Sequence, residues 1–222
     1  MEPHQTKREY LREQRKQQKR KNTTTVLLIA LTAVLLILLV IFLPKLLSPS
    51  KSYNQQSGFS IGNPQAPVTV VEFSNYGCSH CKTFAESVED EFFADYVETG
   101  DVYFTFVNLP YSDEEHLNAA EASYCAAEQN KFYDYKKLLF TYSGSTGAFT
   151  VDRLTSYARN VKLDVNAFTA CMDSNQYAEA YLNDFQYANA IGLTGTPSFL
   201  INGDQLVYAG DLFTTLDAVL GR

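Results

Sequence analysis

A long apolar run near the N-terminus limits most strongly how this chain can fold. Residues 26–43 read VLLIALTAVLLILLVIFL, eighteen residues without a charged side chain. With a rise of about 1.5 Å per residue, a helix of this length nearly spans a hydrocarbon core of about 30 Å. We therefore expect a transmembrane helix at 26–43, which divides the 222 residues into a short N-terminal tail and one domain of ordinary size.

The charges on either side of this run predict its orientation. Residues 1–21 carry eight Lys or Arg and three Glu, a net charge of +5. Because positive flanks stay on the cytoplasmic side, we expect a basic cytoplasmic tail at 1–25 and everything after the run outside the cytoplasmic membrane. A cleaved secretory signal is the alternative, but the run is long for one and FLPKLL at 42–47 lacks small residues for cleavage. Both alternatives export the domain.

The remainder of the chain is acidic. The whole chain has a charge of −7, so residues 22–222 carry −12. Binding to phosphates needs a basic face, and nucleic acid is therefore an unfavourable partner for this domain. Residues 44–57 are rich in Ser, Pro and Gln and predict a linker, so that we place the folded domain at 58–222.

The first part of this domain predicts a β-α-β unit. β-Branched residues indicate strands at 68–73 and 102–107. We expect the helix between them to run from Cys78 to about Val97. Strands joined in this way pair in parallel, with a right-handed crossover.

The second part predicts a helical insert and then a β-hairpin. Residues 113–190 are mostly helical in pattern, and an Asn-Gly dipeptide downstream is a strong hairpin signal. The two hairpin strands and a last helix are expected at 198–201, 205–208 and 213–220. Together these elements predict an α/β fold with a mixed central sheet flanked by helices.

Two cysteines stand three residues apart where the first strand passes into its helix. The Cys78 thiol is expected over the helix N-terminus, where unpaired N–H groups and the dipole stabilise a thiolate, the attacking species. Cys81 is one turn further in and suits resolution of a mixed disulfide. The His80 ring between them is expected to favour the Cys78 thiolate further. A stabilised reduced form makes the disulfide a stronger oxidant.

Two structural interpretations compete with this redox pair. Half of a zinc site is one, but a structural zinc wants four ligands and there is no second CxxC, while the other histidines are His4 and His116. We therefore expect no metal. A purely structural disulfide is the other, and so short a loop constrains little unfolded-state entropy.

The segment VVEFSNYGCSHC at 70–81, with GTPSF at 195–199 far downstream, resembles the DsbA-like branch of the thioredoxin superfamily. The resemblance covers essentially all of 58–222. It implies a thioredoxin fold with the helical insert, and a redox-active disulfide in place of a cofactor. It also implies that Cys78 is the nucleophile, that Cys81 resolves, and that Pro197 is cis beside the pair.

The same resemblance places Glu72 beneath Cys81. A buried carboxylate with a raised pKa would accept the Cys81 proton there. The alternative is an exposed strand residue, since Val71 and Phe73 alternate with Glu72.

The remaining cysteines, Cys125 and Cys171, lie in the insert. An exported chain with an even number of cysteines favours pairing, so we expect a structural disulfide between them. Two separately buried thiols are the alternative. The acids just before His116 are interpreted as partners of a helix dipole rather than as ligands.

The expected function is a membrane-anchored, extracytoplasmic thiol–disulfide oxidoreductase that oxidises unfolded exported proteins. A quinone-linked membrane protein of the DsbB or VKOR type would reoxidise it. Two features leave the direction of electron flow open: Ser79 departs from the best-known oxidases, and Thr196 before Pro197 is also typical of isomerases. A reductase or isomerase is therefore the alternative, and a non-catalytic metal- or peptide-binding module a further one.

Overall fold

The computed structural model describes residues 31–36 and 58–222, and it divides the chain into two units, Met1–Ser52 and Tyr53–Arg222. In the first unit, 31–36 are helical and their side chains are exposed. The rest of the predicted span, the basic tail and the linker lie outside the described residues. Among 31–36 and 58–222, none of the helices has both the length and the apolar character needed to cross a bilayer.

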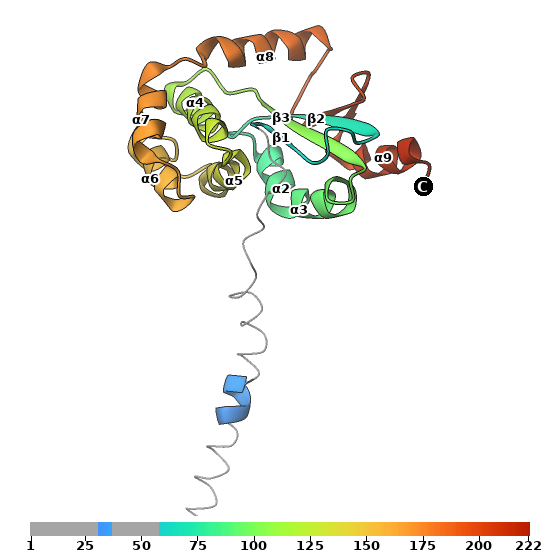
Figure 1. The fold of residues 1–222 in the computed structure, drawn as a ribbon, viewed down its shortest axis with the longest axis horizontal. Helices are drawn as coiled ribbons and strands as arrows, with labels where there is room; N and C mark the ends of the chain where they lie inside the picture. Colours follow the sequence, from blue (N-terminus) through green and yellow to red (C-terminus); the bar gives the residue numbers. More distant parts are fainter. Residues whose placement is uncertain (1–30, 37–57) are drawn as a thin grey trace, which may run out of the picture. The chain divides into compact units, whose positions relative to one another are not determined.

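A mixed sheet of five strands, in the order β1-β3-β2-β4-β5, forms the centre of the second unit (Figure 1). β2 (Val68–Ser74) and β3 (Val102–Asn108) pair in parallel along their whole length, which confirms the predicted β-α-β unit. β4 (Ser198–Ile201) is antiparallel to β2 and forms the predicted hairpin with β5 (Gln205–Tyr208). β1 (Ser60–Ile61) pairs antiparallel with β3. A strand of two residues is too short to show an alternating pattern of side chains, so it was not predicted from the sequence.

The helix after β2 is interrupted, so the single helix predicted from Cys78 to Val97 is wrong. α2 (Ser79–Ser87) is followed by α3 (Glu89–Phe92) and by a π-helical turn, η1 (Phe93–Val97). The break falls at Val88, where φ is −124°. The wider π turn lets the successive aromatic rings of α3 and η1 both enter the core, where they are almost fully buried.

The insert is mostly helical, as the sequence predicted. Its helices are α4 (Glu114–Glu128), α5 (Phe132–Tyr142), α6 (Val151–Asn160), α7 (Val165–Ser174) and α8 (Ala178–Ala190). After the hairpin, a short turn of 3-10 helix, η2 (Ala209–Asp211), leads into α9 (Leu212–Leu220). Figure 1 shows α4, α5, α6 and α7 grouped beside the sheet, with α8 crossing above it.

The two faces of the sheet bury different partners. Val68 and Val70 point into a large aromatic core shared with α2, α3, α5 and α9. Phe73 points to the other face, into a smaller cluster with α8. Because side chains alternate along a strand, Glu72 shares the face of Val70 and enters the aromatic core.

Candidate active site

The first cysteine is placed by the turn at the end of β2. Asn75 holds this turn, because its side-chain oxygen accepts from the Gly77 N–H at 2.6 Å and its carbonyl accepts from the Cys78 N–H at 3.1 Å. Cys78 then becomes the N-cap of α2, and its Sγ accepts from the Cys81 N–H at 3.5 Å. The thiol therefore faces the unpaired amides of a helix N-terminus, as predicted.

The environment of Cys78 favours its thiolate. Partial burial raises the pKa of this thiol, but the hydrogen bonds with Thr196 and with the backbone N–H groups of Cys81 and His80 lower it, and the net shift is downward. The Cys78 Sγ lies 3.4 Å from the Thr196 carbonyl oxygen. The shift makes Cys78 the better nucleophile of the pair at neutral pH.

Cys81 lies in the opposite environment. Its side chain is fully buried, and burial raises the pKa of its thiol to about 12. Both cysteines are free thiols in this structure. A half-buried nucleophile with a stabilised thiolate and a fully buried partner that keeps its proton form the unequal pair that stepwise thiol–disulfide exchange requires.

The loop before β4 closes one side of this pair. The peptide bond from Thr196 to Pro197 is cis, as the resemblance implied. The backbone carbonyl of Thr196 makes the contact with Cys78. Ser198 supports the loop, since its hydroxyl donates to the Gly195 carbonyl at 2.6 Å.

His80 does not contribute in the expected way. Its side chain is exposed, and none of the hydrogen bonds or ion pairs among the described residues involves its ring. His80 contributes to the lowered pKa of Cys78 only through its backbone N–H, after the larger effects of Thr196 and Cys81. The structure therefore gives no contact through which the predicted ring effect would act.

Glu72 is buried, so its interpretation as an exposed strand residue is wrong. No part of its side chain is accessible, and neither of its oxygens has a hydrogen-bond partner among the described residues. Burial raises the pKa of Glu72 to about 7, against the lowering effect of Lys136 and with a further raising effect of Glu89. A carboxyl with this pKa can exchange a proton at neutral pH.

The cation that faces Glu72 was not predicted from the sequence. Lys136 comes from α5 of the insert, and its Nζ lies 3.6 Å from Oε2 of Glu72 and in contact with Oε1 of Glu89. Four aromatic rings surround this ammonium group: Phe104, Phe106, Tyr133 and Phe140. A lysine in a helical pattern is ordinarily solvated, so only the α5 period, which turns Lys136 to the same side as Phe132, Leu139 and Phe140, hinted at its burial.

The predicted structural disulfide is present. Cys125 of α4 is bonded to Cys171 of α7, with their Cα atoms 5.8 Å apart. The bond joins two helices of the insert, and neither cysteine is available for exchange chemistry at the Cys78–Cys81 pair.

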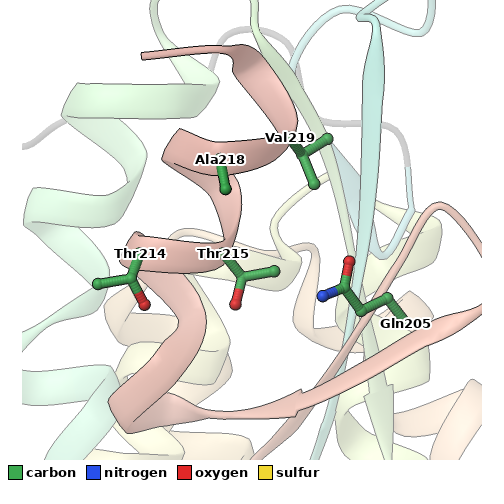
Figure 2. A pocket seen from close by; sticks show the side chains of 5 residues that line it. All are labelled: Gln205, Thr214, Thr215, Ala218 and Val219. Atoms are coloured by element: carbon green, nitrogen blue, oxygen red, sulfur yellow. The ribbon is translucent and has the colours of Figure 1, made fainter.

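Other parts of the described structure offer less chemistry. Figure 2 shows a hollow between β5 and α9, lined by Gln205, Thr214, Thr215, Ala218 and Val219, none of which carries a thiol or an ionisable group. Within 31–36 and 58–222, no group of three or more His, Cys, Asp or Glu side chains is arranged to hold a metal. The redox pair is therefore the candidate active site.

Comparison with known proteins shows which proteins the chain resembles. Disulfide bond formation protein D of Bacillus subtilis is 28% identical over 147 residues, covering 64% of this chain and 66% of that protein. The Na(+)/H(+) antiporter NhaA 3 of Salinispora tropica is 31% identical over 144 residues, 64% of this chain but only 21% of the antiporter. The chain thus spans 66% of one relative and about a fifth of the other.

A solved structure and a family model extend the match. Oxidised BdbD from Bacillus subtilis is 26% identical, with a TM-score of 0.67 over 77% of this chain and 96% of that one. The family model described as Thioredoxin matches residues 54–214, most of the chain. The chain therefore belongs to the thioredoxin family, in its DsbA-like branch.

Proposed function

We propose that this protein is a membrane-anchored thiol–disulfide oxidoreductase that introduces disulfides into exported proteins through Cys78 and Cys81. The observation that carries the proposal is the unequal pair, with a lowered pKa at Cys78 and a raised pKa at the buried Cys81. A stabilised Cys78 thiolate favours the reduced form, so the disulfide form tends to take electrons from other thiols. The name of the Bacillus subtilis relative, disulfide bond formation protein D, is consistent with this direction.

The reaction begins with the Cys78–Cys81 disulfide. A substrate thiolate attacks Sγ of Cys78, a mixed disulfide forms, and the electron pair of the broken bond passes to the Cys81 sulfur. Cys81 takes a proton, for which Glu72 is the buried donor. A second substrate thiolate then attacks the substrate sulfur of the mixed disulfide. The substrate leaves oxidised, Cys78 leaves as a thiolate, and two electrons remain on the enzyme.

The membrane location is part of the proposal. Its support is the uncharged run at 26–43, which follows a basic tail at 1–25 and precedes a linker at 44–57. An anchor of this kind would hold the domain outside the cytoplasmic membrane, near a quinone-linked protein of the DsbB or VKOR type that reoxidises Cys78 and Cys81. The test is sodium carbonate extraction of membranes, in which the full chain stays with the pellet and a chain lacking residues 1–43 is released. Release of both chains would refute the anchor.

The reduction potential tests the direction of electron flow. We would equilibrate the full-length protein, in detergent, with glutathione buffers and quantify the Cys78–Cys81 disulfide by alkylation and mass spectrometry. An oxidase is expected near the DsbA end of the range, about −120 mV. A value near −270 mV, that of thioredoxin, would instead support the reductase or isomerase that Thr196 suggests. Cys78→Ala is the control and must abolish oxidation of a reduced test protein.

If the protein is instead a non-catalytic metal-binding module, a different result is expected. If Cys78 and Cys81 served to hold a metal, the purified protein would contain stoichiometric zinc or copper, and the Cys78→Ala variant would lose it. Elemental analysis of both proteins measures this directly. The oxidoreductase proposal expects catalytic turnover with a metal content that the substitution does not change.

A further inference from the structure

A histidine outside the CxxC motif is held in one orientation close to the redox pair. The ring of His116, in the first turn of α4, has its Nδ1 2.7 Å from both carboxylate oxygens of Asp113, the N-cap residue of that helix. The hydrogen bond with His116 lowers the pKa of Asp113, so this carboxylate is ionised at neutral pH and can only accept. Nδ1 must therefore carry the proton, and Nε2 of the neutral ring has a free lone pair.

That lone pair faces the residue before the nucleophile. A methyl group built onto Gly77 would come within 2.3 Å of Nε2 of His116 and within 2.6 Å of the Tyr111 ring. Only a residue without a side chain allows this approach, and Gly77 directly precedes Cys78. The imidazole thus packs against the backbone that leads into the redox pair.

The ring is fixed on its sides but open to ligand. Tyr111 and Phe149 pack edge-on against His116, with ring centroids 5.1 and 5.3 Å away. Its side chain is 22% exposed and lines a pocket of about 280 Å³ together with Gly77 and the loop before α6. Among the described residues, none forms a hydrogen bond with Nε2.

The sheet order explains why His116 lies beside Gly77, the residue before Cys78. β2, which leads to Cys78, is the neighbour of β3 on one side and of β4 on the other. The loop after β3 leads to His116, and the loop before β4 contains Thr196. The Thr196 carbonyl therefore contacts Cys78 from the β4 side, and the His116 ring approaches the preceding residue, Gly77, from the β3 side.

We propose that His116, oriented by Asp113, is the base that takes the proton of the incoming substrate thiol as that thiol attacks Cys78. The inference rests on the proposed function and deepens it. The thiol proton moves to Nε2, the new bond joins the substrate sulfur to Sγ of Cys78, and the electron pair of the broken disulfide moves to Cys81. The imidazolium then gives its proton to solvent.

A base of this kind would accelerate the exchange at neutral pH. A free cysteine has a pKa of about 8.5, so only a few per cent of a substrate thiol is thiolate at pH 7. Besides Asp113, the titratable groups that face the ring are Tyr111 and Glu115. Glu115 accepts a hydrogen bond from the Phe149 N–H at 3.2 Å, which directs it away from this task. Glu72 is fully buried.

The test is the pH profile of the exchange step. Oxidised full-length protein in detergent would be mixed with a peptide containing one reduced cysteine, and the reaction stopped with acid, alkylated and measured by mass spectrometry from pH 5.5 to 9.5. The wild-type rate should vary little between about pH 7 and 8. The rate of His116→Gln should rise about tenfold per pH unit and lie about tenfold below wild type at pH 7. Above the thiol pKa the two rates should approach each other.

Asp113→Asn is the second variant, because asparagine remains a good N-cap and the helix start is kept. Without the carboxylate charge, the imidazolium that forms during exchange is less favoured. The exchange rate of Asp113→Asn should therefore also fall at pH 7, but by less than that of His116→Gln. Asp164→Asn is the matched control: Asp164 caps α7 in the same way but faces no histidine, and its profile should be that of wild type.

Several outcomes would overturn the inference. An unchanged profile in His116→Gln would exclude a role as base, and an equal loss at every pH would indicate that the ring only supports the Gly77 turn. The reduction potential should not change, because the base alters a rate. A different result would contradict the proposed function. In that case the wild-type protein itself would not exchange with the peptide, or the Cys78→Ala variant would exchange as fast as wild type.

Discussion

The Nζ of Lys136 lies 3.6 Å from the Glu72 carboxylate, although the two residues come from different parts of the fold. Glu72 belongs to β2 and Lys136 to α5 of the insert, and both side chains are at most 1% exposed. Glu89 is the third member of this buried group and also contacts the ammonium. Two carboxyls thus share one cation, which leaves Glu72 able to hold a proton near neutrality.

Replacement of Lys136 with Met should destabilise the protein strongly. Removing one partner of a buried ion pair leaves an uncompensated charge and typically costs about 3–5 kcal/mol. Urea unfolding at pH 7 measures the change, and the loss should shrink at acidic pH as Glu72 becomes protonated. Lys137→Met is the matched control. The Lys137 side chain is exposed, and its Nζ lies 4.0 Å from a carboxylate oxygen of Asp90, which is also exposed. This substitution should change the free energy of unfolding by no more than about 0.5 kcal/mol. Equal effects of the two substitutions would contradict the interpretation.

Glu72 should give the stability of the reduced protein a characteristic pH dependence. Its pKa is about 7 in the folded protein against 4.5 ordinarily. Between these values the folded protein retains a proton that the unfolded chain releases, so stability falls as pH rises from about 4.5 to 7, by up to about 3 kcal/mol. Below about pH 4.5 and above about pH 7, Glu72 does not make the free energy of unfolding depend on pH.

The Glu72→Gln variant should lose this slope, so that it becomes more stable relative to wild type as the pH rises. Urea unfolding at four pH values between 4.5 and 7.5 is the measurement. Glu86→Gln serves as the control, since the Glu86 side chain is 41% exposed. If the wild-type and Glu72→Gln stabilities run parallel over this range, the raised pKa is wrong.

The two thiols of the redox pair should titrate far apart. In the reduced protein, absorbance at 240 nm should report one thiolate forming below the ordinary range for a thiol and a second only near pH 12. Cys81→Ser should retain the early transition and Cys78→Ser should lose it. Iodoacetamide at pH 7 should accordingly modify Cys78 alone; modification of Cys81 first would reverse the assignment of roles.

Loss of the structural disulfide should weaken the fold without changing the redox pair. Cys125 and Cys171 are 46 residues apart, and the chain-entropy relation gives about 4 kcal/mol for a loop of this length. The comparison is made in a background in which Cys78 and Cys81 are both serine, so that only one disulfide is present. Unfolding in urea of the Cys125→Ser, Cys171→Ser double variant measures the loss. When the same double substitution is made with Cys78 and Cys81 retained, the Cys78 thiolate should still form at a lower pH than that of an ordinary thiol.

Local patterns made the centre of the site predictable. The CxxC motif, the strand before it and the turn between them are contiguous, so Cys78 could be placed at a helix N-terminus from sequence alone. The cis bond at Pro197 and the burial of Glu72 followed from the resemblance, because residue statistics give a cis bond only about 5–6% of the time.

Features that depend on contacts between distant segments could not be predicted. Lys136 has an ordinary position in a helical pattern, and only the packing of α5 against the sheet brings it to Glu72. His116 was interpreted with the acids at the start of its helix, because its approach to Gly77 is a property of the sheet order. The break at Val88 lacks the Pro or Gly that marks most helix ends.

The position of Lys136 has a consequence for how this fold can be divided. The insert is continuous with the chain between β3 and β4, and its removal would superficially leave a minimal thioredoxin. That remnant would keep Glu72 and Glu89 in an apolar interior without the ammonium that now offsets them. The insert therefore cannot be exchanged as an independent unit: the charge balance around Glu72 and Glu89 depends on Lys136 of α5, so the sheet and the insert must be varied together.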